Sequence, residues 1–192
     1  MHQFRNILRV ALASTAVAFS QLSLATNIVL YENESVTIDD PEFINGQAGE
    51  PDYFRPQKRN TAGVSNNRFT TFEVVDDVLH VYNGVRNTDG TISDKSDSAK
   101  VIILNATNID LRNKIKIIGA PASLLITASS QITCNSCSFD NVERVTLLAG
   151  QNTSNNGAVQ TLATTNDGRI NVDSLSAPGA VSVDFIADVR LS

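Results

Sequence analysis

Short runs of β-branched and other apolar residues recur along most of the chain, and clusters of Asn, Gly, Asp and Pro separate them. The 192 residues include 18 Val, 15 Ile and 19 Asn. Branched side chains fit a pleated sheet, whereas Asn and Gly supply the backbone angles of tight turns. Each run suits one short strand, so the pattern predicts an all-β protein with strands near 35–38, 72–75, 78–82, 100–104, 114–118, 124–126, 145–148, 159–162, 169–172 and 181–186.

The spacing of these runs narrows the kind of β fold. From Lys100 onward the runs are brief and closely spaced, which favours the stacked coils of a β-solenoid over the long strands of a barrel. No fixed repeat length is found. The segment Pro41–Ala62 holds three of the five Pro and is polar. We therefore expect it to be a strand-poor surface loop, or a cap over the terminal strand edges of the solenoid.

The segment from Met1 to Ala25 has the three parts of a secretory signal peptide. Arg5 and Arg9 precede an uncharged apolar run, Val10–Phe19, and Ser23-Leu24-Ala25 ends the segment with small residues at the two positions that a signal peptidase reads. The run is too short to span a bilayer. We expect cleavage near Ala25 and a mature domain over 26–192, which reaches the periplasm and then the cell surface or the medium.

Composition excludes several classes of function. Asp and Glu outnumber Lys and Arg by 20 to 15, so the chain lacks the dense positive charge that wrapping nucleic acid requires. Only two His are present, and no cluster of His, Cys and carboxylates has the spacing of a transition-metal site. We expect no cofactor and no metal.

Several blocks, in this order, resemble the secretion domain of the filamentous haemagglutinin and haemolysin type of exoprotein. The first block is similar to a "GxSxNxFxxFxV" signature, and later blocks are similar to a central strand pair, a Cys-x-x-Cys-x-Phe motif and an "R-x-T-L-x-x-G" motif. The blocks are Gly63–Val74, Val101–Asn105, Leu111–Gly119, Ala122–Ile126, Ile132–Phe139, Arg144–Gly150, Gly168–Val172 and Asp184–Ala187.

The resemblance implies a right-handed parallel β-helix with a small N-terminal capping sheet and extra-helical hairpins. It also implies two-partner secretion, in which a TpsB-type outer-membrane transporter recognises the domain through periplasmic POTRA domains. Proteins that carry such a domain include adhesins, haemolysins and contact-dependent toxins, so the surface of a host or neighbouring cell is a further expected partner. We interpret the chain as a short or truncated form.

Two groups of residues are expected to contact the transporter because they fall in family-like motifs. The first group is Asn66, Asn67, Arg68 and Phe69. For this group we favour another interpretation, a capped turn into a strand with Asn ordering the backbone and Phe69 or Phe72 in the core.

The second group is Ser129, Ser130, Gln131 and Ile132, where the family has a recognition turn that reads Asn-Pro-Asn-Gly-Ile. Here the motif is degenerate, because Ala128-Ser129-Ser130-Gln131 has neither the Pro nor the Gly that would fix the backbone of a turn.

Cys134 and Cys137 are the only cysteines. A thiol redox site would require a βαβ context and a helix N-terminus, and a zinc site would require two more ligands, which the sequence does not supply nearby. In an oxidising compartment we expect a structural disulfide that holds a tight bend, with redox chemistry and metal binding as the alternatives.

The remaining candidates for chemistry have simpler structural explanations. His80 alternates with Leu79 and Val81, so we expect it on the solvent face of a strand. A glycosidase needs two carboxylates across a cleft, and the candidate pairs are Asp39-Asp40, Asp76-Asp77 and Asp184 with Asp188. Adjacent acids on a strand point to opposite faces, and Asp184 and Asp188 are also the kind of charge that protects a sheet edge. The loop 87–97 is acidic but lacks the ligand spacing of a Ca²⁺ loop.

The sequence therefore predicts an exported, non-enzymatic β-helix protein that acts by contact, with secretion and adhesion as its roles. Main-chain pairing between an edge strand and a strand of the partner would supply affinity. The first alternative is a stand-alone periplasmic or surface module that no longer uses this secretion route. The second alternative is a carbohydrate-active β-helix enzyme.

Overall fold

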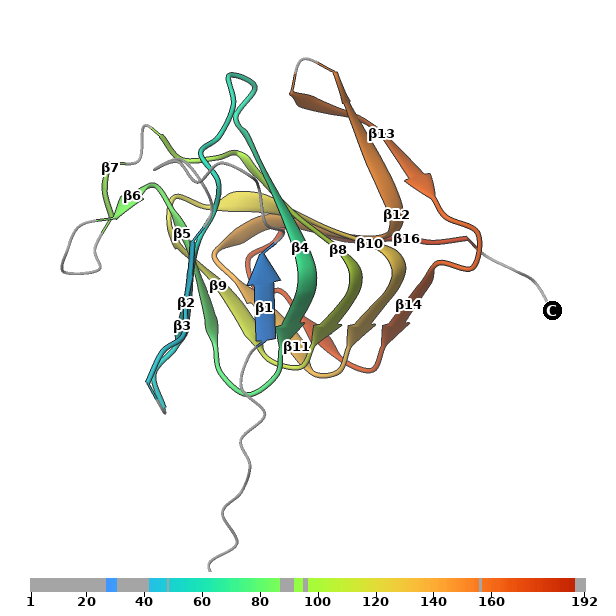
Figure 1. The fold of residues 1–192 in the computed structure, drawn as a ribbon, viewed down its shortest axis with the longest axis horizontal. Helices are drawn as coiled ribbons and strands as arrows, with labels where there is room; N and C mark the ends of the chain where they lie inside the picture. Colours follow the sequence, from blue (N-terminus) through green and yellow to red (C-terminus); the bar gives the residue numbers. More distant parts are fainter. Residues whose placement is uncertain are drawn as a thin grey trace, which may run out of the picture.

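All regular structure in the computed structural model is β-strand; the model describes residues 27–30, 42–47, 49–86, 92–94, 97–155 and 157–188 (Figure 1). Every strand predicted from Phe72 onward overlaps an observed strand, whereas the predicted strand at 35–38 and the predicted signal peptide lie outside the described residues. The strands are β1 (Asn27–Leu30), β2 (Glu42–Ile44), β3 (Asp52–Arg55), β4 (Val64–Val74), β5 (Leu79–Asn83), β6 (Val85–Arg86), β7 (Ile92–Asp94), β8 (Val101–Leu111), β9 (Lys114–Gly119), β10 (Ala122–Cys134), β11 (Cys137–Asp140), β12 (Val142–Asn155), β13 (Ala158–Thr164), β14 (Arg169–Val172), β15 (Leu175–Ser176) and β16 (Ser182–Ile186).

The strands form stacked coils. Long strands β4, β8, β10 and β12 pair in parallel in one sheet, and the short strands β3, β5, β9, β11 and β15 pair in parallel in a second sheet. The chain leaves a long strand, turns into a short strand of the second sheet and returns one strand further along the stack (Figure 1). The fold is therefore a parallel β-helix, as the sequence predicted.

The interior of the coils is filled by columns of apolar side chains. In one column Phe72, Ile109 and Ile132 occupy matching positions of β4, β8 and β10, and all three are buried. Columns of this kind arise because parallel, in-register strands place every second side chain inside and directly above its counterpart in the previous coil. This core holds the coils together.

Antiparallel strands close the N-terminal end of both sheets. β1 pairs with the edge of β4, and β2 pairs with β3 at the edge of the second sheet. The prediction of a strand-poor loop at Pro41–Ala62 is wrong, because β2 and β3 lie in this segment and Phe54 packs against Phe69 in the core. The predicted alternative, that this segment caps the end of the solenoid, is confirmed, because β2 is the terminal strand of the second sheet.

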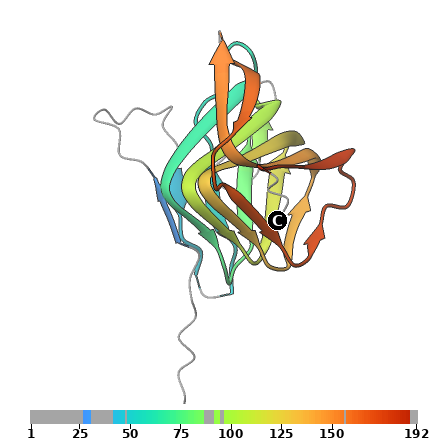
Figure 2. The ribbon, with the colours of Figure 1, turned by 90° about the vertical axis from the view of Figure 1, so that its right-hand side faces the viewer.

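Two antiparallel hairpins leave the coils, namely β6 with β7 and the second half of β12 with β13. β12 runs beside β10 as far as Ala149 and then departs at Gly150 (Figures 1 and 2). Glycine is required there, because a Cβ at Gly150 would lie 2.0 Å from the carbonyl oxygen of Ala163 in β13. After the hairpin the chain returns to the stack as β14, beside the second half of β10.

Candidate functional site

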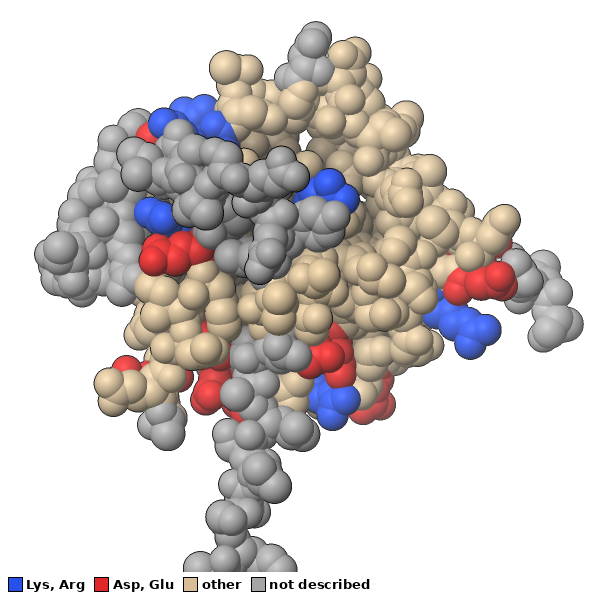
Figure 3. All heavy atoms as spheres, in the orientation of Figure 1, with Lys and Arg blue, Asp and Glu red and all other residues tan. Residues whose placement is uncertain are grey.

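A polar groove lies on the outer face of the long strands, beside the β12/β13 hairpin. It has a volume of about 450 Å³. The space-filling view shows the surface hollowed beside the hairpin (Figure 3). Its lining side chains come from four strands of successive coils: Asn66, Arg68, Phe69 and Thr70 of β4, Asn105, Ala106 and Thr107 of β8, Ser129 of β10, and Gln151, Asn152 and Ser154 of β12.

The groove follows a bend that crosses three long strands. Register pairing between β4 and β8 stops at Arg68 with Asn105 and resumes at Phe72 with Ile109. Between β8 and β10 it stops at Ala128 and resumes at Gln131. The interruption lies at corresponding positions in adjacent coils, so outward side chains beside it are brought together although they are far apart in the sequence.

The first predicted group lies in the middle of β4, and the strand divides it between two faces. Asn66 and Arg68 are exposed and line the groove, whereas Asn67 and Phe69 are buried, with Phe69 reaching the floor of the groove. The expected capped turn is wrong, because all four residues lie within one continuous strand and alternate across it. The expected core role of Phe69 and Phe72 is confirmed, since their rings pack edge to face with centroids 4.7 Å apart.

Asn67 is a completely buried amide that fixes the strand beneath the groove. Its Oδ1 accepts a hydrogen bond of 2.7 Å from the Gln57 backbone N–H, and its Nδ2 donates to the Ile103 carbonyl oxygen at 3.0 Å. The same Nδ2 also donates to Ser65 Oγ. The amide therefore joins the segment before β4 to the neighbouring coil, which positions Asn66 and Arg68 on the opposite face.

The second predicted group is not a turn. Ser129 and Ser130 are the extra residues of an irregularity inside β10, opposite the single residue Thr107 of β8, and both are exposed. Gln131 is half-buried and Ile132 is completely buried in the interior column. A β-bulge bends a strand without ending it, so the strand passes the corner where the family motif has a turn. Of this group, Ser129 lines the groove.

The hairpin forms one wall of the groove and is fastened across the stack. Val159 of β13 packs against a small apolar cluster on the outer sheet face, which contains Val64, Ile103, Leu125 and Leu148.

Asn60 Nδ2, in the segment before β4, donates to the Gly157 carbonyl oxygen at the hairpin tip, at 2.9 Å. Gly157 has φ +78°, and a Cβ there would lie 2.3 Å from Asn60 Nδ2. Glycine is therefore required for this contact.

The chemistry of the groove is that of amides, hydroxyls and one guanidinium. Arg68 is the one charged side chain among its described lining residues. Asn105 Nδ2 donates a hydrogen bond to Thr127 Oγ1 at 2.6 Å. This bond fixes the orientation of the Asn105 amide in the groove. Amides and hydroxyls both donate and accept hydrogen bonds, so this surface suits a polar ligand such as a peptide main chain.

Among the groove residues, Asn66, Arg68, Phe69 and Ser129 were identified from the sequence, and the others were not. Asn105 and Thr107 have the alternation of outward strand residues, and Asn105 stands opposite Arg68. That correspondence is visible only once the coils are aligned. Gln151, Asn152 and Ser154 belong to a hairpin whose return path the sequence does not specify.

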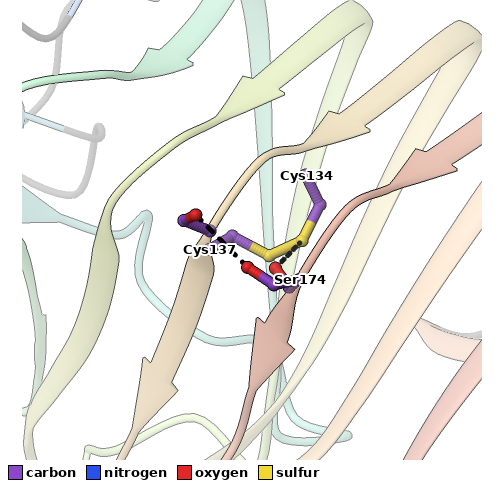
Figure 4. The surroundings of a disulfide bond; sticks show 4 residues. Cys134, Cys137 and Ser174 are labelled. Carbon is purple, nitrogen blue, oxygen red and sulfur yellow. Dashed lines mark hydrogen bonds between the residues drawn. A yellow bond between two sulfur atoms is a disulfide. The ribbon is translucent and has the colours of Figure 1, made fainter.

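Cys134 and Cys137 form a disulfide bond at the corner between β10 and β11 (Figure 4). Their Cα atoms are 5.3 Å apart and both residues are buried. Ser136 between them has φ +62°, and Cys134 Sγ lies 3.5 Å from the Ser174 carbonyl oxygen of the next coil. The bond therefore holds a tight corner of the stack and is shielded from solvent.

His80 lies on the outer face of the second sheet, while its neighbours Leu79 and Val81 are fully buried. The imidazole is half-buried and contacts the Tyr53 ring edge to face at 5.8 Å between centroids. Burial lowers the pKa of His80, and the charge of Lys116 on the adjacent strand lowers it further.

The carboxylate pairs considered for a glycosidase lie in different parts of the chain and do not share one cleft among the described residues. Asp76 and Asp77 lie in the turn between β4 and β5, and Asp39-Asp40 lies outside the described residues. Asp184 pairs with Arg144 at 3.6 Å, whereas Asp188 lies beyond the end of β16. Within the described ranges, no group of three or more His, Cys, Asp or Glu is placed to hold a metal ion.

Among the residues whose placement is described, no helix is long and apolar enough to cross a membrane. No family model matches the chain. Over 128 residues, which cover 61% of this chain, the sequence is 31% identical to Toxin CdiA of Yersinia pestis, but the match covers 4% of that protein.

Among solved structures, the chain is similar to the filamentous haemagglutinin secretion domain, with a TM-score of 0.64 and 20% identity. The match covers 83% of this chain and 55% of that one, so the chain spans about half the length of the solved structure. The resemblance predicted from the ordered sequence blocks is confirmed: this chain has the fold of the filamentous haemagglutinin secretion domain.

Proposed function

We propose that the chain is an exported, non-enzymatic domain of the two-partner secretion type, which an outer-membrane transporter recognises through the polar groove. The periplasmic POTRA domains of the transporter would contact Asn66 and Arg68 of β4 and Ser129 of β10. The adhesion role and the final location at the cell surface or in the medium belong to the same proposal.

One observation carries the proposal. Two family-like segments that are well separated in the sequence, one in β4 and one in β10, contribute exposed polar side chains to one groove on this fold. Residues of the same segments that face inward, Asn67, Phe69 and Ile132, pack the core and hold the groove in shape.

Recognition at this groove would rely on hydrogen bonds and one charge. The amides and hydroxyls can pair with the main chain of an extended partner segment, and Arg68 favours a segment that carries a carboxylate. Among the described lining residues of the groove there is no acid or histidine that could transfer protons, which supports a contact role.

Export in the presence of a transporter tests the proposal. The chain, residues 1–25 included, is expressed with and without a co-expressed two-partner transporter that carries POTRA domains, and the fraction in the medium is measured. We expect transporter-dependent release, and we expect Arg68→Ala to lower it about tenfold, as loss of one central interface residue does. Asn66→Ala should lower release less, because it removes no charge.

Arg112→Ala is the matched control, since Arg112 is an exposed arginine that pairs with Asp110 away from the groove. It should be released like the unmodified chain. Release that does not depend on the transporter would contradict the proposal and would instead fit a module that has left this route. Equal release of the Arg68→Ala and Arg112→Ala variants would show that the groove is not the recognition surface.

A further inference from the structure

The β12/β13 hairpin forms one wall of the polar groove, and most of its outer surface faces solvent. Every residue of β13 from Gln160 to Thr164 is exposed. At the base of the hairpin, Thr165 donates hydrogen bonds through its N–H to the Ala149 carbonyl oxygen and through Oγ1 to the Ser129 carbonyl oxygen. Elements with few buried contacts open at a low cost in free energy. The hairpin is therefore suited to move as a unit about this base.

Val159 and Gly157 hold the outer part of the hairpin against the stack. Val159 packs against the apolar cluster on the outer sheet face, which includes Ile103. The Gly157 carbonyl oxygen accepts a hydrogen bond of 2.9 Å from Asn60 Nδ2. Val159 is also the register partner of Ser154, which lines the groove. The contacts near the hairpin tip therefore set the position of the groove wall.

The direction of the Asn60 amide nitrogen follows from the bonds of its oxygen. Asn60 Oδ1 accepts hydrogen bonds from the backbone N–H groups of Ala62, at 2.9 Å, and Val64, at 3.0 Å. These bonds form the turn that precedes β4, and they leave Nδ2 directed at the Gly157 carbonyl oxygen. In Figure 1 this turn and the hairpin rise side by side at the top of the view. One side chain thus joins the start of one groove wall to the tip of the other.

We propose that the hydrogen bond from Asn60 to Gly157 is a latch that holds the hairpin closed over the groove, and that Asn60 is thereby a positioning residue for recognition. When the bond breaks, the hairpin moves away from the stack and carries the groove-lining side chains of β12 with it. A wall that is already in place lowers the entropy that binding costs. The inference rests on the proposed function in one respect, namely that the groove is the recognition surface.

Opening of the hairpin has a structural signature that does not depend on secretion. Ile103 points to the outer face of β8, yet it is 1% exposed because it belongs to the cluster against which Val159 packs. Ile186 near the end of β16 packs against the same cluster, but β10 and β12 separate β16 from β8. A thiol at position 103 therefore reports movement of the hairpin.

Alkylation of the exported Ile103→Cys variant tests the latch. The native cysteines are buried and bonded to each other, so the introduced thiol is the one that reacts. Adding Asn60→Asp keeps the oxygen that accepts from Ala62 and Val64 but removes the Nδ2 donor. The alkylation rate should rise about tenfold, because a factor of ten corresponds to about 1.4 kcal/mol, the size of one hydrogen bond. Gly157→Ala should act in the same way, since its Cβ would displace Asn60 Nδ2.

Two controls separate the latch from effects of charge and of global stability. Asn155→Asp adds the same charge to the exposed hairpin tip and keeps the bond, so it should leave the Ile103→Cys rate unchanged. Ile109→Cys places a thiol in the interior column of the same strand, where it reacts only when the coils open. Its rate should not respond to Asn60→Asp.

Two alkylation results would overturn the latch. One is an Ile103→Cys rate that Asn60→Asp does not change. The other is an equal rise at Ile109→Cys, which would show that Asn60 supports the whole fold rather than the hairpin.

Transporter-dependent release tests the positioning role. Asn60→Asp should lower release about threefold, because apparent affinity falls with the fraction of molecules whose groove is closed, and Asn155→Asp should not lower it. Normal release of Asn60→Asp beside reduced release of Arg68→Ala would overturn the positioning role and leave the proposed function standing. If Arg68→Ala is also released normally, the proposed function fails and the positioning role fails with it, while the alkylation rates still decide whether the latch exists.

Discussion

Buried amides rather than charges hold the groove in place at the scale of single residues. Asn67 satisfies both its oxygen and its nitrogen inside the protein, and Asn83 does the same between β5 and the next coil. The sequence predicted an ordering role for Asn in this region, but at a turn. Its placement inside a strand could not be predicted, because the decisive partners, such as the Ile103 carbonyl oxygen, belong to a different coil.

Replacing Asn67 with Ala should lower the free energy of unfolding by about 2–4 kcal/mol, because the Gln57 N–H and the Ile103 carbonyl would lose their buried partner. Chemical denaturation measures this change. Asn66→Ala, one position along on the exposed face, should change the free energy of unfolding by less than about 0.5 kcal/mol. Similar losses in the two variants would disprove the division of β4 into two faces.

His80 should make stability depend on pH. Its pKa is lowered in the folded protein, so the unfolded chain binds a proton first as the pH falls. The free energy of unfolding should therefore be highest above the unfolded pKa of about 6.5 and should decrease as the pH drops below it. Denaturation at pH 7.5 and 5.5 measures the difference, and His80→Gln should reduce it. An unchanged pH dependence in His80→Gln would contradict this role.

At the scale of elements, the long strands turn corners by bulging and bending rather than by ending. The sequence suggested a degenerate turn at Ala128–Gln131, where Pro and Gly are missing. Without those residues the backbone has no reason to leave the extended region, so β10 continues through the corner with Ser129 and Ser130 as extra residues. A chain reversal between β12 and β13 was predictable from its Asn and Gly, but where the hairpin packs depends on contacts with β4 and β8.

The Cys134–Cys137 disulfide closes a very short loop, so its contribution to stability is small. The loop-entropy model gives about 2 kcal/mol for such a bond. Reduction in denaturant followed by refolding should therefore lower the free energy of unfolding by about that amount and leave a folded protein. Both cysteines are buried, so thiol reagents should not reduce the bond in the folded state within minutes. Rapid reduction of the native protein would show that the bond is accessible, and would revive the redox alternative.

At the scale of the whole molecule, the fold class could be predicted and the coil repeat could not. Corresponding positions of successive coils are Val64, Val101, Ser123, Arg144 and Ser182, and the intervals between them are unequal. The two middle intervals, from Val101 to Ser123 and from Ser123 to Arg144, are nearly the same, and each contains one coil without an insertion. The first and last are much longer, because they contain the excursions β6/β7 and β12/β13. These insertions conceal the period, while the alternation within each strand remains visible because the interior columns require it.

The contact between Asn60 and Gly157 spans 97 positions of the chain, and it fastens the start of the first coil to a hairpin that emerges from the fourth. A polypeptide that arranges itself from its beginning can wind the early coils one at a time. The hydrogen bond from Asn60 nevertheless cannot form until the chain as far as Gly157 has folded. Formation of this one hydrogen bond therefore marks the end of folding of the coils. A spectroscopic probe placed at the hairpin tip would detect that step.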